Sequence, residues 1–142
     1  MKNSFTFLII ALIIISCSST KNKTFTEEKN TTAVQNDTVR IANDELQYEV
    51  IIIDPGFSGW LLSRAHPRNY HSQSYMENRN RAWVTGWNQN VIAGRNPQLF
   101  EMSINYQNNI DYGYEVNYLL YNYLTYFQLT NNISLGGFPA RI

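Results

Sequence analysis

The sequence predicts a small α+β fold: a single domain ordered strand–helix–strand–helix, in which a two- to three-stranded sheet packs against two helices. Three patterns predict it: a run of β-branched residues, two stretches with apolar residues at helical spacing, and one stretch in which apolar and polar residues alternate. We expect the domain over residues 46–129 of the 142. This length is near the lower end at which one apolar core suffices without metals or disulfides.

The first strand is expected over residues 46–54, which contain the run Val50-Ile51-Ile52-Ile53. β-Branched residues favour strands, and an apolar run of this length is typical of a buried central strand. Asp54-Pro55-Gly56 should end the strand in a turn, because Pro presets one dihedral of the turn and Gly supplies a positive φ. Residues 57–62 form a short apolar segment, and their sequence leaves undecided whether they form a further strand or another element. Residues 63–71 are expected to be an irregular loop.

The first helix is expected to begin at Ser74, because Ser74-Tyr75-Met76-Glu77 has the pattern of a capping box. Gly94 fits the position just past the end of this helix, and Pro97 prevents its continuation. Between these limits the mainly apolar residues of one helix face recur at spacings of three and four along the chain. This face consists of Met76, Asn80, Trp83, Val84, Trp87 and Val91.

A second strand and a second helix are expected in the C-terminal half. Residues 100–106 alternate between apolar and polar side chains, which is the pattern of a half-buried strand. The helix is expected over residues 111–128, with Asp111 as its N-cap. Tyrosines spread around its surface outside the apolar face: Tyr114, Tyr118, Tyr121 and Tyr126. Residues 130–142, with two adjacent glycines and a proline, are expected to be a loose tail.

Charge narrows the class of partner. Eleven Lys and Arg residues balance eleven Asp and Glu residues, so the formal net charge is zero. A nucleic-acid binder needs a basic surface to neutralise phosphates, and this balance argues against one. All four lysines lie within residues 2–29, so the predicted domain uses only arginine as its full cation. Arginine suits planar contacts with carboxylates and aromatic faces, although chance composition is the alternative.

The N-terminus has the features of a signal peptide over residues 1–16. Lys2 precedes an apolar run over residues 5–15, which is too short to cross a bilayer as a helix. The run ends in Ile14-Ile15-Ser16-Cys17, which resembles the bacterial lipoprotein signal, in which the cysteine is lipidated and becomes the mature N-terminus. Cys17 is the single cysteine and therefore has no partner for an internal disulfide. The alternative is a plain secretory leader, or an uncleaved buried segment, with an incidental cysteine.

A lipid on Cys17 implies attachment to a membrane. Ser18, not Asp, follows the cysteine, so the outer membrane is favoured, and the lack of an adjacent acidic cluster favours its periplasmic face, with the cell surface left open. Residues 17–45 are rich in Ser, Thr, Asn and Lys and are expected to form a disordered tether behind this lipidated N-terminus. Within the tether, Asp37-Thr38-Val39 resembles the O-glycosylation signal of Bacteroidota, with Thr38 as the acceptor, although such short matches are common.

Motifs for catalysis are weak. The chain has no phosphate-binding glycine loop, zinc-spaced Cys/His pairs or nucleophile elbow, so we predict no cofactor and no metal. Asp54 and Glu77 lie near His66 and His71 in the sequence, so a metal site or an acid/base pair is conceivable. A small envelope hydrolase would use His66 or His71 with Asp54. Solvated loop histidines are the favoured alternative. Asp54 is better explained as an acceptor for the amides of the following turn, and Asp111 as a helix cap.

The favoured function is the binding of an envelope protein or glycan without catalysis. The loop interleaves cationic and aromatic residues without an acid, which suits an anionic polymer or a lipid headgroup. Exposed helix tyrosines would add contact area at little entropic cost. The candidate binding surface consists of Arg64, His66, Arg68, Tyr70, His71, Tyr114, Tyr118 and Tyr121. An ordinary polar loop with core tyrosines, and hence a purely structural lipoprotein, is the alternative.

Four segments of the predicted domain share the pattern of a known family. They are Tyr48–Phe57 with Trp60, Tyr75–Val84, Trp87-Asn88, and Ile110–Tyr118. In these segments the chain resembles an uncharacterised Bacteroidota lipoprotein family, domain of unknown function 6146. The resemblance spans most of residues 46–128 and leaves the tail after Thr130 outside. It implies a location and a lineage, and it brings no activity, cofactor or catalytic residue.

Overall fold

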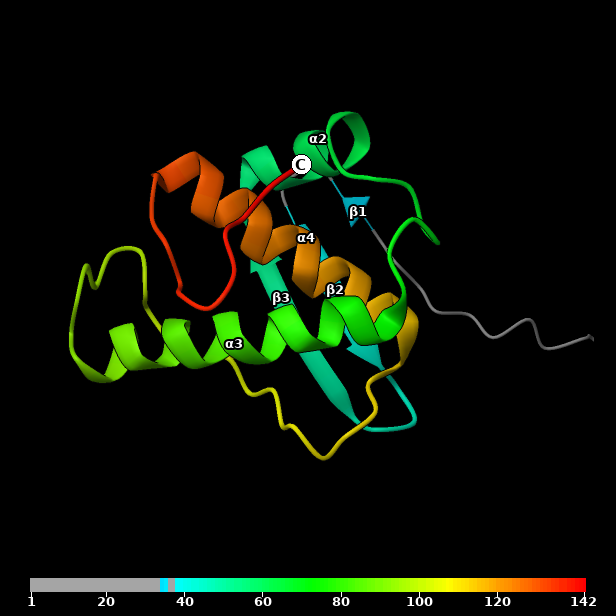
Figure 1. Cartoon of the computed structure of the whole chain (residues 1–142), viewed down its shortest axis with the longest axis horizontal. Coiled ribbons are helices and arrows are strands. Elements are labelled where there is room, and N and C mark those ends of the chain that lie inside the picture. The colour runs from blue at the N-terminus through cyan, green and yellow to red at the C-terminus, as the bar shows by residue number, and fades with distance from the viewer. Residues whose placement is uncertain (1–33, 36–37) are drawn as a thin grey trace, which may run out of the picture.

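A computed structural model, which describes residues 34–35 and 38–142, contains three antiparallel strands followed by three helices (Figure 1). The strands are β1 (Val34–Gln35), β2 (Thr38–Asn43) and β3 (Tyr48–Ile53). The helices are α2 (Pro55–Ser63), α3 (Gln73–Ile92) and α4 (Gly113–Asn131). The predicted α+β class is confirmed, because one small sheet and the helices pack around a common core.

The sheet has the order β1-β2-β3, and β2 pairs with β3 from Thr38 opposite Ile53 to Asn43 opposite Tyr48. The predicted strand at 46–54 is confirmed, but its central position is wrong. β3 has one neighbour among the described strands, and its alternate residues face outward, with Ile51 56% and Ile53 76% exposed. Its β-branched run therefore reflects strand propensity and not burial on both faces.

The ordered domain begins before residue 46. β2 occupies Thr38–Asn43, within the stretch predicted to be a disordered tether. Val39 and Ile41 are almost completely buried, at 1% and 0% exposed, and Arg40 on the opposite face bonds to Glu49 of β3. Two buried side chains and the hydrogen-bonded ladder to β3 are enough to order these six residues. The composition of the stretch around them had predicted no ordered structure.

The segment after β3 is a helix. Asp54 is its N-cap, its Oδ1 accepts from the Gly56 amide at 3.0 Å, and Pro55 occupies the first helical turn. The sequence Asp-Pro-Gly therefore starts a helix where a turn was predicted, because Pro needs no amide partner at this position. Helix α2 also settles the open assignment of residues 57–62, and it buries Phe57 completely.

Helix α3 confirms the first predicted helix with a different start. Ser72 is the N-cap and accepts from the Tyr75 amide at 3.2 Å, so the capping box predicted at Ser74 is wrong by two residues. Gly94 has φ +61° just past the end of the helix, as predicted. The predicted apolar face is buried at Met76, Asn80, Trp83, Val84 and Trp87.

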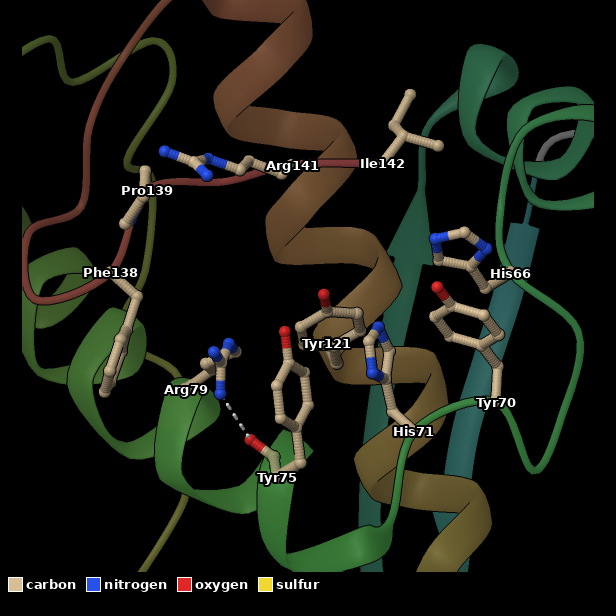
Figure 2. Close-up of a pocket in the computed structure, with 10 residues that line it drawn as sticks. All are labelled: His66, Tyr70, His71, Tyr75, Arg79, Tyr121, Phe138, Pro139, Arg141 and Ile142. Carbon is tan, nitrogen blue, oxygen red and sulfur yellow. Dashed lines mark hydrogen bonds between the residues drawn. The ribbon is translucent and has the colours of Figure 1, made fainter.

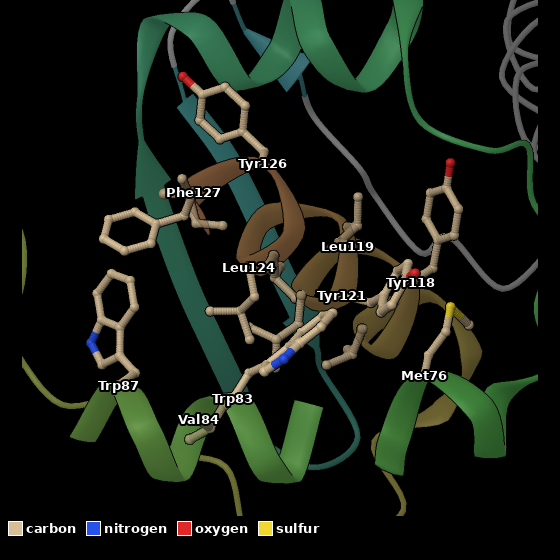
Figure 3. Close-up of a cluster of buried hydrophobic side chains, with 14 of the residues drawn as sticks. Met76, Trp83, Val84, Trp87, Tyr118, Leu119, Tyr121, Leu124, Tyr126 and Phe127 are labelled. Atoms are coloured by element: carbon tan, nitrogen blue, oxygen red, sulfur yellow. The ribbon is translucent and has the colours of Figure 1, made fainter. Parts of the chain in front are cut away.

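Helix α4 is the centre of the core, because it packs against α3 on one side and against β2 and α2 on the other (Figures 1 and 3). Its predicted helical spacing is confirmed. The prediction that tyrosines are spread over the surface of this helix is wrong for three of the four, since Tyr118 is 6%, Tyr121 6% and Tyr126 8% exposed. Tyr114 is partly buried. Asp111 accepts from the Gly113 amide at 2.9 Å, so it bonds to the start of the helix, although Tyr112 is the N-cap.

The predicted strand at residues 100–106 is absent, since this part of the described chain forms an extended connection without a strand partner. Side chains of α3 satisfy its backbone instead. Trp87 Nε1 donates to the Met102 carbonyl at 2.9 Å, and Asn88 both donates to the Ile104 carbonyl and accepts from the Ile104 amide. The burial expected from the alternation holds only in part: Phe100 is 4% exposed and Ile104 and Tyr106 are partly buried, whereas Met102 is 73% exposed.

The C-terminal tail is docked and not loose. Leu135 is 4% exposed, and its amide donates to Gln128 Oε1 at 2.9 Å. Trp83 Nε1 donates to the Phe138 carbonyl at 3.0 Å, which fixes the next part of the tail over α3. Gly86 makes this crossing close, because a side chain there would overlap the backbone of Leu135.

Candidate functional site

The Arg/His loop, residues 64–71, lies against α4 and is held there by side chains of that helix. Arg68 forms a bidentate ion pair with Glu115, with Nε 2.8 Å from Oε2, and its guanidinium lies 4.6 Å from the centre of the Tyr118 ring. A planar guanidinium can make both contacts at once. The loop and the tyrosine-bearing helix therefore meet, as two parts of one face.

Helix tyrosines anchor this loop through their hydroxyls. Tyr118 donates to the His66 carbonyl at 2.8 Å, and Tyr114 accepts from the Asn69 amide at 2.6 Å while donating to the His71 carbonyl at 3.2 Å. The Tyr118 ring is buried, the Tyr114 ring is partly buried, and each hydroxyl finds a backbone partner. The prediction of an exposed tyrosine patch is therefore wrong, because the loop covers the rings that would have formed it.

A pocket of about 330 Å³ lies where the Arg/His loop, α3, α4 and the C-terminal tail come together (Figure 2). We call it the loop–tail pocket. Its lining consists of His66, Tyr70, His71, Tyr75, Arg79, Tyr121, Phe138, Pro139, Arg141 and Ile142. Four elements distant in sequence contribute, so no single stretch of the chain contains the site.

Aromatic and cationic groups stack along the wall of this pocket. The His71 and Tyr75 rings are parallel with centroids 4.1 Å apart, and Arg79 lies 3.4 Å from the other face of Tyr75 in the order seen in Figure 2. Phe138 covers Arg79 in turn, at 4.7 Å. His66 and Tyr70 form a second parallel pair at 3.8 Å. Because ring faces are occupied by one another, the polar tips of these side chains are left for the pocket.

The electrostatics of the pocket are one-sided. Two arginines and two histidines line it, and none of the ten lining side chains is acidic. Burial, followed by the nearby positive groups of His66 and Arg79, lowers the pKa of His71 below its ordinary value. Burial raises the pKa of Tyr121 to about 12, so its phenol remains a neutral hydroxyl. Within the part of the chain that the structure describes, no carboxylate forms an ion pair with Arg79 or Arg141.

The predicted binding surface separates into three groups. His66, Tyr70, His71 and Tyr121 line the pocket, whereas Arg68, Tyr114 and Tyr118 hold the loop in place. Arg64 is exposed at the end of α2 and does neither. Sequence reasoning missed Tyr75, Arg79 and Arg141. The spacing of four between Tyr75 and Arg79 on a predicted helix was a usable signal for that pair, but nothing in the sequence linked the tail to the loop.

The acid/base pair considered for a hydrolase is not assembled. Asp54 Oδ1 accepts from the Gly56 amide and, at 2.9 Å, from the Tyr126 hydroxyl. Its predicted role as an acceptor for the following amides is confirmed, although these amides begin a helix and not a turn. The histidines instead stack with tyrosines. No group of three His, Cys, Asp or Glu residues that could hold a metal ion occurs among the described residues.

Two predicted modifications stay predictions. Cys17 and the signal peptide lie outside the described residues. Thr38 is the first residue of β2, opposite Ile53, and is partly exposed, but nothing tests its glycosylation. None of the helices in residues 34–35 and 38–142 has the length and hydrophobicity to span a bilayer.

Comparison with known proteins gives one match. The model of a family of unknown function (DUF6146) matches residues 5–140, which includes the tail that the resemblance left outside. No curated protein and no solved structure matches the chain. The match covers nearly the whole sequence and agrees with the resemblance seen in four segments of the domain. The chain therefore belongs to this family of unknown function.

Proposed function

We propose that this chain is an envelope lipoprotein, attached through a lipidated Cys17 to the periplasmic face of the outer membrane, whose domain binds an envelope saccharide without catalysis. The observation that carries the proposal is the loop–tail pocket. Its hydroxyls, imidazoles and guanidinium groups converge from four elements on one concave space. Such convergence of polar groups in a pre-formed hollow is typical of a ligand site.

The size of the pocket favours a saccharide unit over a protein surface. Ligand pockets usually enclose about 300–1,000 Å³, and the loop–tail pocket encloses about 330 Å³. A protein partner would need a broad exposed patch, and the tyrosines expected to form one are buried beneath the loop. Hydroxyl-rich sugars match the mixture of donors that line the pocket, namely Tyr70, Tyr75, Tyr121 and the two histidines.

Catalysis is disfavoured by the chemistry of the lining. Most glycoside hydrolases use two carboxyl groups on either side of the scissile bond, and no lining side chain of this pocket carries one. Asp54, the acid available to the alternative hydrolase, is bonded to Tyr126 at the other end of α4 from the loop anchors. Binding is therefore the function that the geometry supports best.

The anchor is tested by labelling growing cells with a fatty-acid analogue. The wild-type chain and Ser18→Ala should carry the label, whereas Cys17→Ala should not, because its thiol is the proposed attachment point. Label that persists on Cys17→Ala refutes the lipid anchor. Fractionation of the envelope with protease accessibility then places the domain on one face of the outer membrane.

The binding site is tested with the full-length protein in detergent, immobilised and exposed to isotope-labelled saccharides released from purified envelopes. Tyr70 is 60% exposed and lines the pocket, so Tyr70→Ser should reduce retention with little effect on folding. Met102→Ser is the matched control, since Met102 is also exposed, at 73%, and lies outside the pocket. Equal retention by both variants, or none by the wild type, contradicts saccharide binding here and favours a purely structural lipoprotein.

A further inference from the structure

We propose that the loop–tail pocket recognises an acidic group on its ligand, a phosphate or carboxylate carried by a sugar ring. This inference rests on the proposed binding function and adds the charge of the ligand to it. The loop, α3 and the tail each supply basic side chains to the lining: the imidazoles of His66 and His71, and the guanidinium groups of Arg79 and Arg141.

Arg79 is the best-placed donor. Its guanidinium lies between the Tyr75 ring, at 3.4 Å, and the Phe138 ring, at 4.7 Å, which fixes the plane of the group. Nη1 donates to the Tyr75 carbonyl at 3.2 Å, and a guanidinium has five N–H donors, so further donors remain for a ligand. A planar fork held in place is the geometry that binds phosphate and carboxylate oxygens in pairs.

The aromatic groups add to the preference for an anion. His71 meets Tyr70 edge-on at 4.7 Å and His66 edge-on at 5.6 Å, while its face is covered by Tyr75. Ring edges carry partial positive charge and ring faces partial negative charge. Because these contacts engage ring edges as well as ring faces, the aromatic wall offers an anion its N–H and O–H donors. A sugar would be held chiefly through its acidic substituent and hydroxyls.

Binding of a negatively charged ligand should be coupled to protonation of His71 in the Arg/His loop. The groups that face His71 are His66, Tyr70, Tyr75, Tyr121 and Arg79, and none of them is an acid. Burial and the positive neighbours lower the pKa of His71, so its imidazole is neutral in the free protein near neutral pH. A bound anion supplies the missing negative charge and raises that pKa again, so binding takes up a proton and tightens as the pH falls.

The test uses the full-length protein in detergent with four probes: glucuronate, glucose 6-phosphate, inorganic phosphate and uncharged glucose. Isothermal titration should show binding of both acidic sugars and at least a roughly tenfold weaker response to glucose, as expected when charge-assisted hydrogen bonds are lost. Glucuronate serves for the pH series, because its carboxylate stays ionised while phosphate titrates near pH 6. The affinity for glucuronate should rise about tenfold between about pH 7.5 and about pH 5.5. This is the change expected when binding takes up a fraction of one proton over these two pH units.

Arg141→Gln is the first variant, because Arg141 is exposed and forms no ion pair with a described residue. It should weaken the binding of glucuronate about fivefold, which is the upper range for an exposed charge pair. Arg95→Gln should not weaken it, because Arg95 is exposed and lies outside the pocket. His71→Gln keeps a planar donor and should flatten the pH series. Circular dichroism checks that each variant is folded.

The outcomes separate the two proposals. If glucose binds as tightly as glucuronate and Arg141→Gln has no effect, the acidic-group inference is wrong while saccharide binding stands. If inorganic phosphate binds as tightly as glucose 6-phosphate, the site takes a free anion and the sugar part is wrong. If no acidic probe binds although envelope saccharides are retained in the Tyr70→Ser comparison, the acidic-group inference alone fails. Equal weakening by Arg141→Gln and Arg95→Gln shows a general charge effect and also overturns it.

Discussion

Replacement of Gly86 by alanine tests whether the tail is part of the domain. A Cβ at Gly86 would overlap the Leu135 carbonyl oxygen and lie 2.9 Å from its carbonyl carbon, and both atoms are backbone. The tail must therefore shift. Alanine should gain about 1 kcal/mol of helix propensity, whereas overpacking loses about 1–3 kcal/mol, and displacing Leu135 loses part of the roughly 1.5–3 kcal/mol of its burial.

The expected sum is a loss of about 1–3 kcal/mol in the free energy of unfolding for Gly86→Ala. Gly59→Ala is the matched control, because Gly59 lies within α2 and a Cβ there meets nothing within 4 Å. That variant should gain about 0.5–1 kcal/mol. The two substitutions should therefore change the free energy of unfolding in opposite directions, because the tail covers Gly86 and not Gly59.

Urea unfolding followed by tryptophan fluorescence measures both effects in the full-length chain. Amide exchange at Leu135, whose N–H donates to Gln128 Oε1, should accelerate in Gly86→Ala and remain slow in Gly59→Ala. Because Phe138 and Arg141 line the pocket, Gly86→Ala should also weaken saccharide retention. If Gly86→Ala is as stable as Gly59→Ala and Leu135 stays protected, the close crossing of tail and helix is refuted.

Three further predictions concern groups perturbed by burial. Tyr118→Phe removes the hydroxyl that donates to the His66 carbonyl at 2.8 Å, so it should lower the free energy of unfolding by about 1 kcal/mol and speed amide exchange in the Arg/His loop; unchanged exchange contradicts the anchoring role. Burial raises the pKa of Tyr121 and of Tyr123 from 10.0 to about 12, so stability present below about pH 10 should be lost as the pH rises further. Tyrosinate absorbance should then show a late cooperative step, and ionisation of every phenol near pH 10 would disprove it. Burial and nearby positive charge lower the pKa of His71 from 6.5, so the unfolded chain binds more protons there and stability should fall as the pH drops below about 6.5. His71→Gln should flatten that decline in urea midpoints, and an unaltered decline would assign it to another group.

Element types were predictable where the signal is local. The β-branched run in β3, the helical spacing of α3 and α4, and Gly94 at the end of α3 all appear where expected. These features depend on neighbours within about four residues of each other along the chain. They can therefore be predicted without knowledge of the rest of the fold.

Predictions failed where the partner of a segment is distant. The alternation over residues 100–106 predicted a strand with one buried face, but Met102 on that face is 73% exposed. Trp87 and Asn88 of α3 bond the backbone of this segment in place of a strand. β2 shows the converse case. Val39, Ile41 and Ala42 are apolar, but the polar stretch around them predicted a tether, and pairing with β3 orders them. In both segments the hydrogen-bond partner, and not the pattern, decides the structure.

The candidate site was predicted in part. The Arg/His loop, part of the predicted binding surface, supplies His66, Tyr70 and His71 to the pocket. Exposure of the helix tyrosines was predicted wrongly, because periodicity shows which residues share a face and not which segment covers that face. Arg68 and the tyrosine hydroxyls bring the loop down onto α4, and this docking could not be inferred from spacing.

The sequence by itself determined the class of the fold, the types and most of the limits of its long helices and of β3, and the absence of acids from the Arg/His loop. Only the tertiary structure decided that the tail closes one side of the pocket, that Arg79 and Arg141 join the loop histidines, and that Asp54 stands apart from them. The physical reason is distance along the chain. Propensity and capping act over a few residues, whereas burial and the pocket depend on contacts between segments that are up to 76 residues apart, from His66 to Ile142.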